Sequence, residues 1–241
     1  MRSLVWAPLR ERYPADAPRP DLVVNFAGVT GAGPGLSANT DLALAGFATG
    51  ATRMIAMSSA AVYGPTADAP ASEDGPVAPA GEYGRSKLAM EAALLRHVKT
   101  TADRALVLRL GNIAGADALL GAARPGARVV LDRFGTRAGG PIRSYIGPVT
   151  LARVLRELAV AMLSDRPLPD VLNVAAPGAV AMGDLLDAAG LDWGYRPAGP
   201  QAIERVVLDT ARLQGIVPLG PETGDAAGIV AEWRAVAQRR T

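Results

Sequence analysis

Short apolar runs and amphipathic runs alternate along this chain, and this alternation constrains its fold more than any other feature. Strands are predicted for the apolar runs at residues 22–26, 53–59, 105–110 and 170–175. Helices are predicted at residues 37–49, 83–98, 148–163, 182–190 and 225–240. Ser37 or Asn39 suits the N-cap of the first helix, Gly50 its end, and Pro148 a first helical turn. The pattern predicts an α/β fold with a doubly wound, mainly parallel sheet.

Composition excludes several classes of function. The chain has 241 residues and a formal net charge of +2, and its arginines form no basic stripe, which argues against nucleic-acid binding. It has no cysteine and one histidine, His97, so disulfides, thiol nucleophiles and the usual zinc sites are excluded, and we expect no metal. The N-terminal apolar stretch is too short for a signal peptide, and the most apolar helix carries Arg153, Arg156 and Glu157. We therefore expect a cytoplasmic protein without a membrane partner.

The stretch "EYGRSK" places Tyr83 and Lys87 four residues apart on a predicted helix, so the two side chains share one face. A tyrosine hydroxyl with a pKa near ~10 is a poor base at neutral pH, and lowering that pKa by about three units costs roughly 4 kcal/mol. A lysine ammonium and an oxidised nicotinamide ring can together stabilise the phenolate. A nearby serine can hydrogen-bond a substrate oxygen as its proton leaves. This combination is typical of hydroxyl–carbonyl redox chemistry.

Several motifs accompany this pair: a strand that ends in Ser58-Ser59, the turn "VYG", Glu73 in the following loop, and "SKLAMEAAL" after the tyrosine. With these motifs the chain resembles the extended short-chain dehydrogenase/reductases of the NAD-dependent epimerase/dehydratase family, typified by UDP-galactose 4-epimerase. The resemblance runs from about Asp21 to the C-terminus. It implies that Ser59 is the catalytic serine and Tyr83 the acid/base. It also implies that Lys87 binds the nicotinamide ribose and lowers the pKa of Tyr83.

The resemblance continues downstream of the tyrosine. In "LRLGNIAG" it makes Asn112 a substrate contact, and in "IRSYIGPVTLARVL" it makes Arg143 the arginine that grips a nucleotide-sugar diphosphate. Two residues depart from the family pattern, because Ser144 stands where the family has aspartate and Gly147 where it has histidine. These departures leave open a second interpretation of Arg143, as a surface arginine, and Asn112 could equally form a turn.

The glycine-rich stretch "NFAGVTGAGPG" (25–35) resembles the family's fourth strand rather than its phosphate-binding turn, because the next strand ends in serines instead of a ribose-binding acid. The resemblance makes Phe26, Ala27 and Gly28 cofactor-side residues, together with Ser58. Only about twenty residues precede this strand, and the glycine fingerprint is not among them. We expect an N-terminally shortened Rossmann-like sheet in which residues 3–6 pair with residues 22–26 to cover the open edge.

These observations predict an NAD(P)-dependent oxidoreductase or epimerase that acts on a nucleotide sugar or a similar small molecule. NAD is the cofactor that the resemblance favours, and a homodimer is an assembly that it allows. The predicted dinucleotide-binding core comprises residues 1–112 and 145–175, and a small substrate-binding part comprises residues 113–144 and 176–241. The alternative is a non-catalytic dinucleotide-fold protein that has lost the cofactor phosphate site and serves in binding or assembly.

Overall fold

The computed structural model describes residues 4–30, 34–123 and 126–238 of the chain. The chain divides into two compact units, which we describe separately. The first unit comprises residues 1–62, 79–109 and 159–172, and the second comprises residues 63–78, 110–158 and 173–241.

The first unit is built on a four-stranded sheet in the order β1-β2-β3-β8. Its strands are β1 (Val23–Asn25), β2 (Arg53–Ser59), β3 (Arg104–Leu110) and β8 (Val171–Val174), the last of which ends in the second unit. β1 and β2 are parallel, and the connections from β1 to β2 and from β2 to β3 run through helices, as parallel strands require. The five central residues of β2 are all buried, which explains why this strand is a continuous apolar run.

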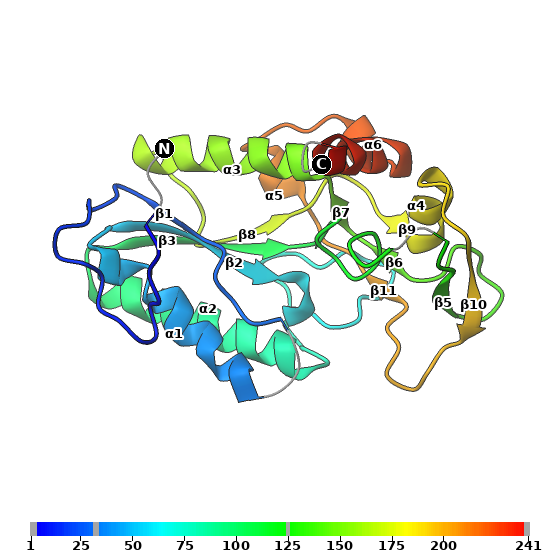
Figure 1. Ribbon diagram of the computed structural model, residues 1–241, viewed down its shortest axis with the longest axis horizontal. Helices are drawn as coiled ribbons and strands as arrows, with labels where there is room; N and C mark the ends of the chain where they lie inside the picture. The colour runs from blue at the N-terminus through cyan, green and yellow to red at the C-terminus, as the bar shows by residue number, and fades with distance from the viewer. Residues whose placement is uncertain (1–3, 31–33, 124–125, 239–241) are drawn as a thin grey trace. The chain divides into compact units, whose positions relative to one another are not determined.

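Helices α1 (Ala38–Leu44) and α2 (Glu82–Thr100) lie together on one face of this sheet (Figure 1). The last turn of α3 (Pro148–Leu163), which also belongs to the first unit, lies on the other face. Between the sheet and the first two helices is an apolar core formed by Ala43, Met54, Ala56, Met90, Leu94 and Val107. The fold is therefore the predicted α/β class with a Rossmann-like, doubly wound sheet.

Short helical turns occur in both units, three in the described part of the first unit and one in that of the second. They are η1 (Pro34–Ser37), η2 (Phe47–Thr49), η3 (Ala60–Val62) and η4 (Pro221–Thr223). Gly50 follows η2 with φ of 83°, a left-handed conformation that glycine adopts at little cost, and so ends this helical segment as predicted. Pro148 is the first residue of α3, also as predicted.

The second unit contains three small sheets: β10-β5, β11-β6-β9 and β4-β7. Their strands are β4 (Asn112–Ile113), β5 (Val129–Arg133), β6 (Ile142–Arg143), β7 (Tyr145–Ile146), β9 (Val180–Ala181), β10 (Trp193–Pro197) and β11 (Arg205–Val206). Its helices are α4 (Met182–Ala188), α5 (Ala211–Gln214) and α6 (Ala226–Ala237), besides the start of α3. An apolar cluster that includes Leu120, Tyr145, Leu185, Leu186 and Ile229 forms its core. Residues 113–145 thus contain four short strands or parts of them.

The predicted pairing of residues 3–6 with residues 22–26 is wrong for the part of the chain that the structure describes; Ser3 lies outside it. Residues 4–6 form no strand, and β1 pairs with β2 only. The reason is local, because Trp6 Nε1 donates to the carbonyl of Glu11 and the Trp6 ring packs edge-on against Tyr13, with 5.1 Å between centroids. The segment therefore folds on itself, and Val5 is 94% exposed.

Candidate active site

The candidate site lies in the first unit, where β2 ends and α2 begins. The Ser59 side chain hydrogen-bonds the hydroxyl of Tyr83, and its Oγ also accepts the amide hydrogen of Ala61 at 3.2 Å. One turn further along α2, Lys87 is 4% exposed and its Nζ donates to the carbonyl of Met57 at 2.9 Å. The structure thus brings together the three side chains predicted to be catalytic.

Gly84 explains how the start of α2 approaches the end of β2 so closely. A Cβ atom at this position would overlap the carbonyl oxygen of Ala61 and lie 2.8 Å from the Cβ of Pro79. Only glycine allows the helix to pack at this distance without displacement. The residue next to Tyr83 therefore sets the separation across which Ser59 and Tyr83 meet.

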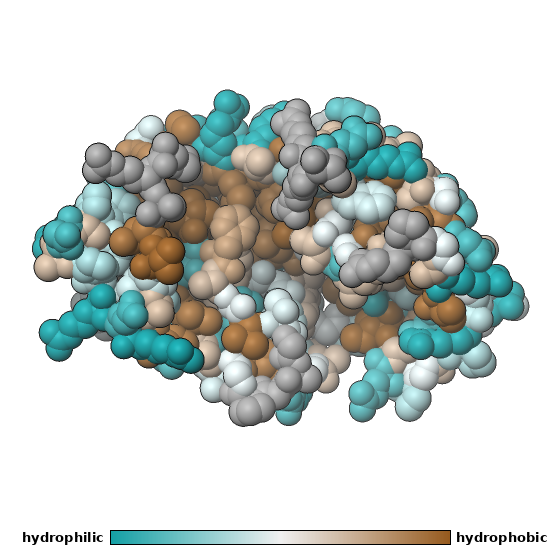
Figure 2. Space-filling model, in the orientation of Figure 1, coloured by the Kyte–Doolittle hydropathy of each residue, from teal (hydrophilic) through white to brown (hydrophobic). Residues whose placement is uncertain are grey.

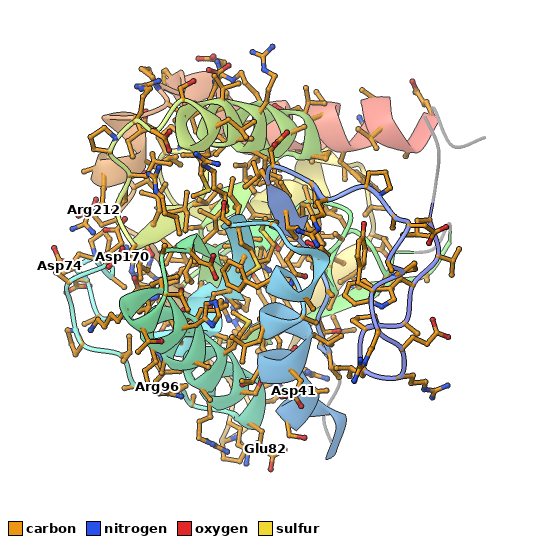
Figure 3. All side chains as sticks on the ribbon, turned by 90° about the vertical axis from the view of Figure 1, so that its left-hand side faces the viewer. Asp41, Asp74, Glu82, Arg96, Asp170 and Arg212 are labelled. Atoms are coloured by element: carbon orange, nitrogen blue, oxygen red, sulfur yellow. The ribbon has the colours of Figure 1, made fainter. Side chains whose placement is uncertain are left out.

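Helix α2 carries charged residues on both its exposed face and its buried face. Glu82 and Arg96 are exposed and point away from the sheet (Figure 3). Lys87 and Glu91 point inward and are buried. Burial lowers the pKa of the Lys87 ammonium, and the nearby charge of Glu91 partly opposes this effect.

The hydroxyl of Tyr83 has a raised pKa in this ligand-free structure. Burial raises the pKa because it penalises the phenolate, and the hydrogen bond from Ser59 only partly lowers it. Lys87 Nζ donates to the Met57 carbonyl. Tyr83 is therefore protonated at neutral pH when no ligand is present.

The loop after β1 carries the residues predicted to face the cofactor. Phe26, Ala27 and Gly28 are exposed, and Phe26 has 59% of its surface accessible. A Cβ atom on Gly28 would lie 3.1 Å from Lys87 Nζ, so the absence of a side chain leaves open backbone beside the lysine. Ser58 is buried instead, and its Oγ donates to Glu91 at 2.5 Å.

Asn39 holds this loop in place, and sequence reasoning considered it only as a helix cap. Its Oδ1 accepts the amide hydrogen of Val29 at 2.8 Å, and its Nδ2 donates to the Val29 carbonyl and to Ser86 Oγ at 3.1 and 3.0 Å. An asparagine four residues after a glycine-rich stretch is the signal in the sequence that could have indicated this role, and the structure shows it fully buried. Ser37 makes no side-chain cap either.

The two residues predicted to bind substrate belong to the second unit, and both have partners within the protein. The Arg143 guanidinium donates to the carbonyls of Ile142, Ile203 and Glu204 at 2.7 to 3.0 Å. Asn112 hydrogen-bonds the hydroxyl of Tyr145, which also donates to Asp117 Oδ2 at 2.8 Å. Burial lowers the pKa of Arg143 and raises that of Tyr145.

The structure also explains the departures from the family pattern at Ser144 and Gly147. Ser144 is 2% exposed, and its Oγ accepts the amide hydrogen of Leu208 at 2.9 Å. Gly147 makes room for Glu232 of α6, whose carboxylate lies where a side chain at residue 147 would begin. That carboxylate accepts the amide hydrogens of Val149 and Thr150 at 2.9 and 2.8 Å and so caps α3.

Among the described residues, no helix combines the length and apolarity needed to cross a membrane. Within the same residues, no group of three or more histidine and acidic side chains is placed to hold a metal ion. Apolar side chains reach the surface in several places on the face drawn in Figure 2. The exposed large apolar residues in the first 30 residues of the described chain are Leu4, Val5, Leu9, Val24 and Phe26.

The fold and the grouping of Ser59, Tyr83 and Lys87 define a Rossmann-like α/β protein with a tyrosine–lysine–serine site. The model of the NAD dependent epimerase/dehydratase family matches residues 7–134, which is more than half of the chain. The protein belongs to this family. No curated protein matches the chain.

Solved structures with the same fold include several sugar-nucleotide enzymes. A UDP-galactose 4-epimerase is 19% identical with a TM-score of 0.69, and the match covers 91% of this chain and 78% of that one. MoeE5, solved with UDP-glucose and NAD, is 22% identical with a TM-score of 0.71, covering 92% and 80%. DesIV, a dTDP-glucose 4,6-dehydratase from Streptomyces venezuelae solved with NAD and TYD, is 18% identical with a TM-score of 0.71, covering 91% and 74%. At these identities the similarity shows the fold.

Proposed function

We propose that this chain is an NAD(H)-dependent oxidoreductase or epimerase that acts on a hydroxyl or carbonyl group of a nucleotide sugar or a related small molecule. The observation that carries this proposal is the hydrogen bond between Ser59 and Tyr83 beside the buried Lys87 at the end of β2. Membership of the epimerase/dehydratase family supports the same chemistry. The UDP-glucose bound in the MoeE5 structure and the naming of DesIV as a dTDP-glucose 4,6-dehydratase support the class of substrate.

Each of the three side chains has a separate role in this proposal. Tyr83 first releases its own proton to solvent, and its phenolate oxygen then takes the proton of a substrate hydroxyl; in the reverse direction the protonated Tyr83 gives its proton to a carbonyl oxygen. Ser59 turns its single hydroxyl hydrogen from Tyr83 to the same substrate oxygen and donates a hydrogen bond to it. Lys87 supplies a positive charge that favours the phenolate once its Nζ turns from the Met57 carbonyl. When bound, NAD accepts the hydride from the carbon that carries the hydroxyl, and NADH returns it.

The described residues fit the nicotinamide half of NAD. Gly28 leaves backbone exposed next to Lys87 Nζ, and the neighbouring Ala27 and Phe26 are exposed on the same loop. Lys87 and the backbone near Gly28 would hold the nicotinamide ribose. The alternative function is that of a non-catalytic dinucleotide-fold protein that serves in binding or assembly.

Thermal melts of the full chain with NAD+, NADH, NADP+ and NADPH separate the two functions. A ligand at about 100 times its Kd stabilises the folded state by roughly 2.7 kcal/mol, which raises Tm by a few degrees. We expect a shift with NAD+ or NADH, lost in Lys87→Met and retained in Lys99→Met, which changes the other lysine of the chain. A cooperatively melting protein that shows no shift with any of the four ligands would favour the non-catalytic alternative.

A further inference from the structure

Three consecutive residues of β2 each contact a different turn of α2. The Met57 carbonyl accepts from Lys87, the Ser58 hydroxyl donates to Glu91, and the Ser59 side chain bonds Tyr83. Tyr83, Lys87 and Glu91 are spaced at four-residue intervals and so share one helix face. Two of these contacts involve the candidate catalytic groups, and the third lies between them in the strand sequence.

The third contact belongs to a buried ion pair. Glu91 is 2% exposed and Arg109 of β3 is 6% exposed. Glu91 Oε2 accepts from Arg109 Nη2 at 2.8 Å, and both carboxylate oxygens lie 3.2 Å from Arg109 Nε. Oε1 also accepts from Ser58, so the carboxylate is tied to β2 and β3 at once. A carboxylate with these bonds has little freedom to move.

A gain in folding stability would not by itself explain the buried ion pair of Glu91 and Arg109. Burying an ion pair costs desolvation energy, and well-packed apolar residues of similar size are often as stable or more so. A fixed position of Ser58 is a stronger reason, because its two neighbours in the chain hold Lys87 and Tyr83. A shift of Ser58 along α2 would carry Met57 and Ser59 with it, and so would disturb the contacts that hold Lys87 and Tyr83.

We propose that Glu91, fixed by Arg109, is a positioning residue that holds the end of β2 against α2 and thereby sets the places of Lys87 Nζ and the Tyr83 hydroxyl. The inference rests on the proposed function in that Lys87 and Tyr83 are the catalytic groups of that function. Glu91 itself acts through Ser58 and takes no proton from the substrate.

The chain offers a matched control at the opposite ends of the same two strands. Asp165 accepts from Arg53, the first residue of β2, at 3.0 Å and from Arg104, the first residue of β3, at 2.7 Å. Asp165→Asn therefore weakens a carboxylate link between the same strands without touching the candidate site. Only two lysines are present, so Lys99, which is exposed, provides an internal reference for Lys87.

The test measures hydrogen exchange of the lysine ammonium groups by ¹⁵N NMR on the full chain without ligand. In Ser58→Ala, the exchange of Lys87 should become about tenfold faster, as expected when a hydrogen bond is weakened, while Lys99 stays unchanged. Ser58→Thr keeps the hydroxyl and should keep the slow exchange, and so should Asp165→Asn. Because Glu91→Gln removes the negative charge that faces the buried Arg109 and could unfold the chain, the double variant Glu91→Met/Arg109→Met provides the second test and should also speed exchange.

Slow exchange of Lys87 in a folded Ser58→Ala or in the folded double variant would overturn the proposal, and so would an equal acceleration in Asp165→Asn. These readouts need neither cofactor nor substrate. If the wild-type chain binds no dinucleotide but Lys87 exchanges as expected, the proposed function fails and the positioning by Glu91 stands.

Discussion

Gly84 faces the carbonyl oxygen of Ala61 so closely that a Cβ atom on Gly84 would overlap it, and the first turn of α2 therefore meets η3, directly after β2, without an intervening side chain. Gly84→Ala should force the helix away and cost about 1–3 kcal/mol in the free energy of unfolding, as overpacking usually does. It should also weaken the contact of Ser59 with Tyr83 and lower turnover. Urea unfolding and a cofactor reduction assay measure the two effects.

Gly81 provides the control for this substitution. It lies three residues earlier in extended backbone, and a Cβ atom there would meet nothing within 4 Å. Gly81→Ala should therefore change stability by no more than about 0.5 kcal/mol and leave turnover intact. Equal effects of the two substitutions would show that the close approach at Gly84 has no special importance.

The pKa of Tyr83 provides a second prediction. It is raised above the ordinary value of 10.0, so most of Tyr83 should remain protonated in the ligand-free protein at that pH. Ser59→Ala removes the hydrogen bond that lowers this pKa and should raise it further. Because the folded state holds the proton more tightly, the contribution of Tyr83 to stability is complete below pH 10 and decreases as the pH rises through the folded-state pKa.

Absorbance titration at alkaline pH, with Tyr83→Phe subtracted, isolates this phenolate from the signals of the other tyrosines. A Tyr83 component that titrates below its ordinary value without ligand would contradict the prediction. It would mean that Lys87 already acts on the hydroxyl in the free protein.

Glu232 should be important for stability because it caps α3 through Val149 and Thr150. Glu232→Gln should cost about 0.5–2 kcal/mol, since a helix N-terminus loses a charged acceptor. Gly147→Ala should cost a comparable amount, because the new methyl group displaces the carboxylate. Gly199→Ala is the control, as a Cβ atom there meets nothing within 4 Å. Thermal melts should therefore separate the first two variants from the third.

Substitution of Arg143 tests whether this residue, predicted to bind substrate, has a structural role instead. Its guanidinium donates to three backbone carbonyls, and Arg143→Met should cost roughly 1–3 kcal/mol because these three hydrogen bonds are lost. Arg137→Met, which removes a mostly exposed arginine that lies 3.6 Å from Glu204, should have little effect. If Arg143 grips a diphosphate, the Arg143 variant would show a raised KM with unchanged stability.

The sequence predicted the elements whose signals are local. β2 begins and ends at the predicted residues. α2 is longer than the predicted helix by one residue at its start and two at its end. Tyr83 and Lys87 could be grouped because their four-residue spacing places them on one helix face, and the family resemblance added Ser59 to the group. Gly50 and Pro148 act through their own backbone conformations, which also depend on few neighbours.

The missed features depend on residues far apart in the chain. β5 pairs with β10 over 60 residues later, and the polar, partly exposed "WGYRP" carries no strand periodicity. Asn39 serves a loop ten residues earlier, and Arg143 satisfies carbonyls about sixty residues later. The raised pKa of Tyr83 depends on how deeply α2 is buried, which no spacing of residues reveals.

The two lysines of the chain also differ in chemical accessibility. Lys87 is buried on the inner face of α2, and Lys99 is exposed near its end. Besides the α-amino group, amine-reactive reagents should therefore label Lys99 at once and reach Lys87 only when α2 separates from the sheet. The rate of acylation at Lys87, relative to Lys99, would measure how often the native protein opens at its candidate active site.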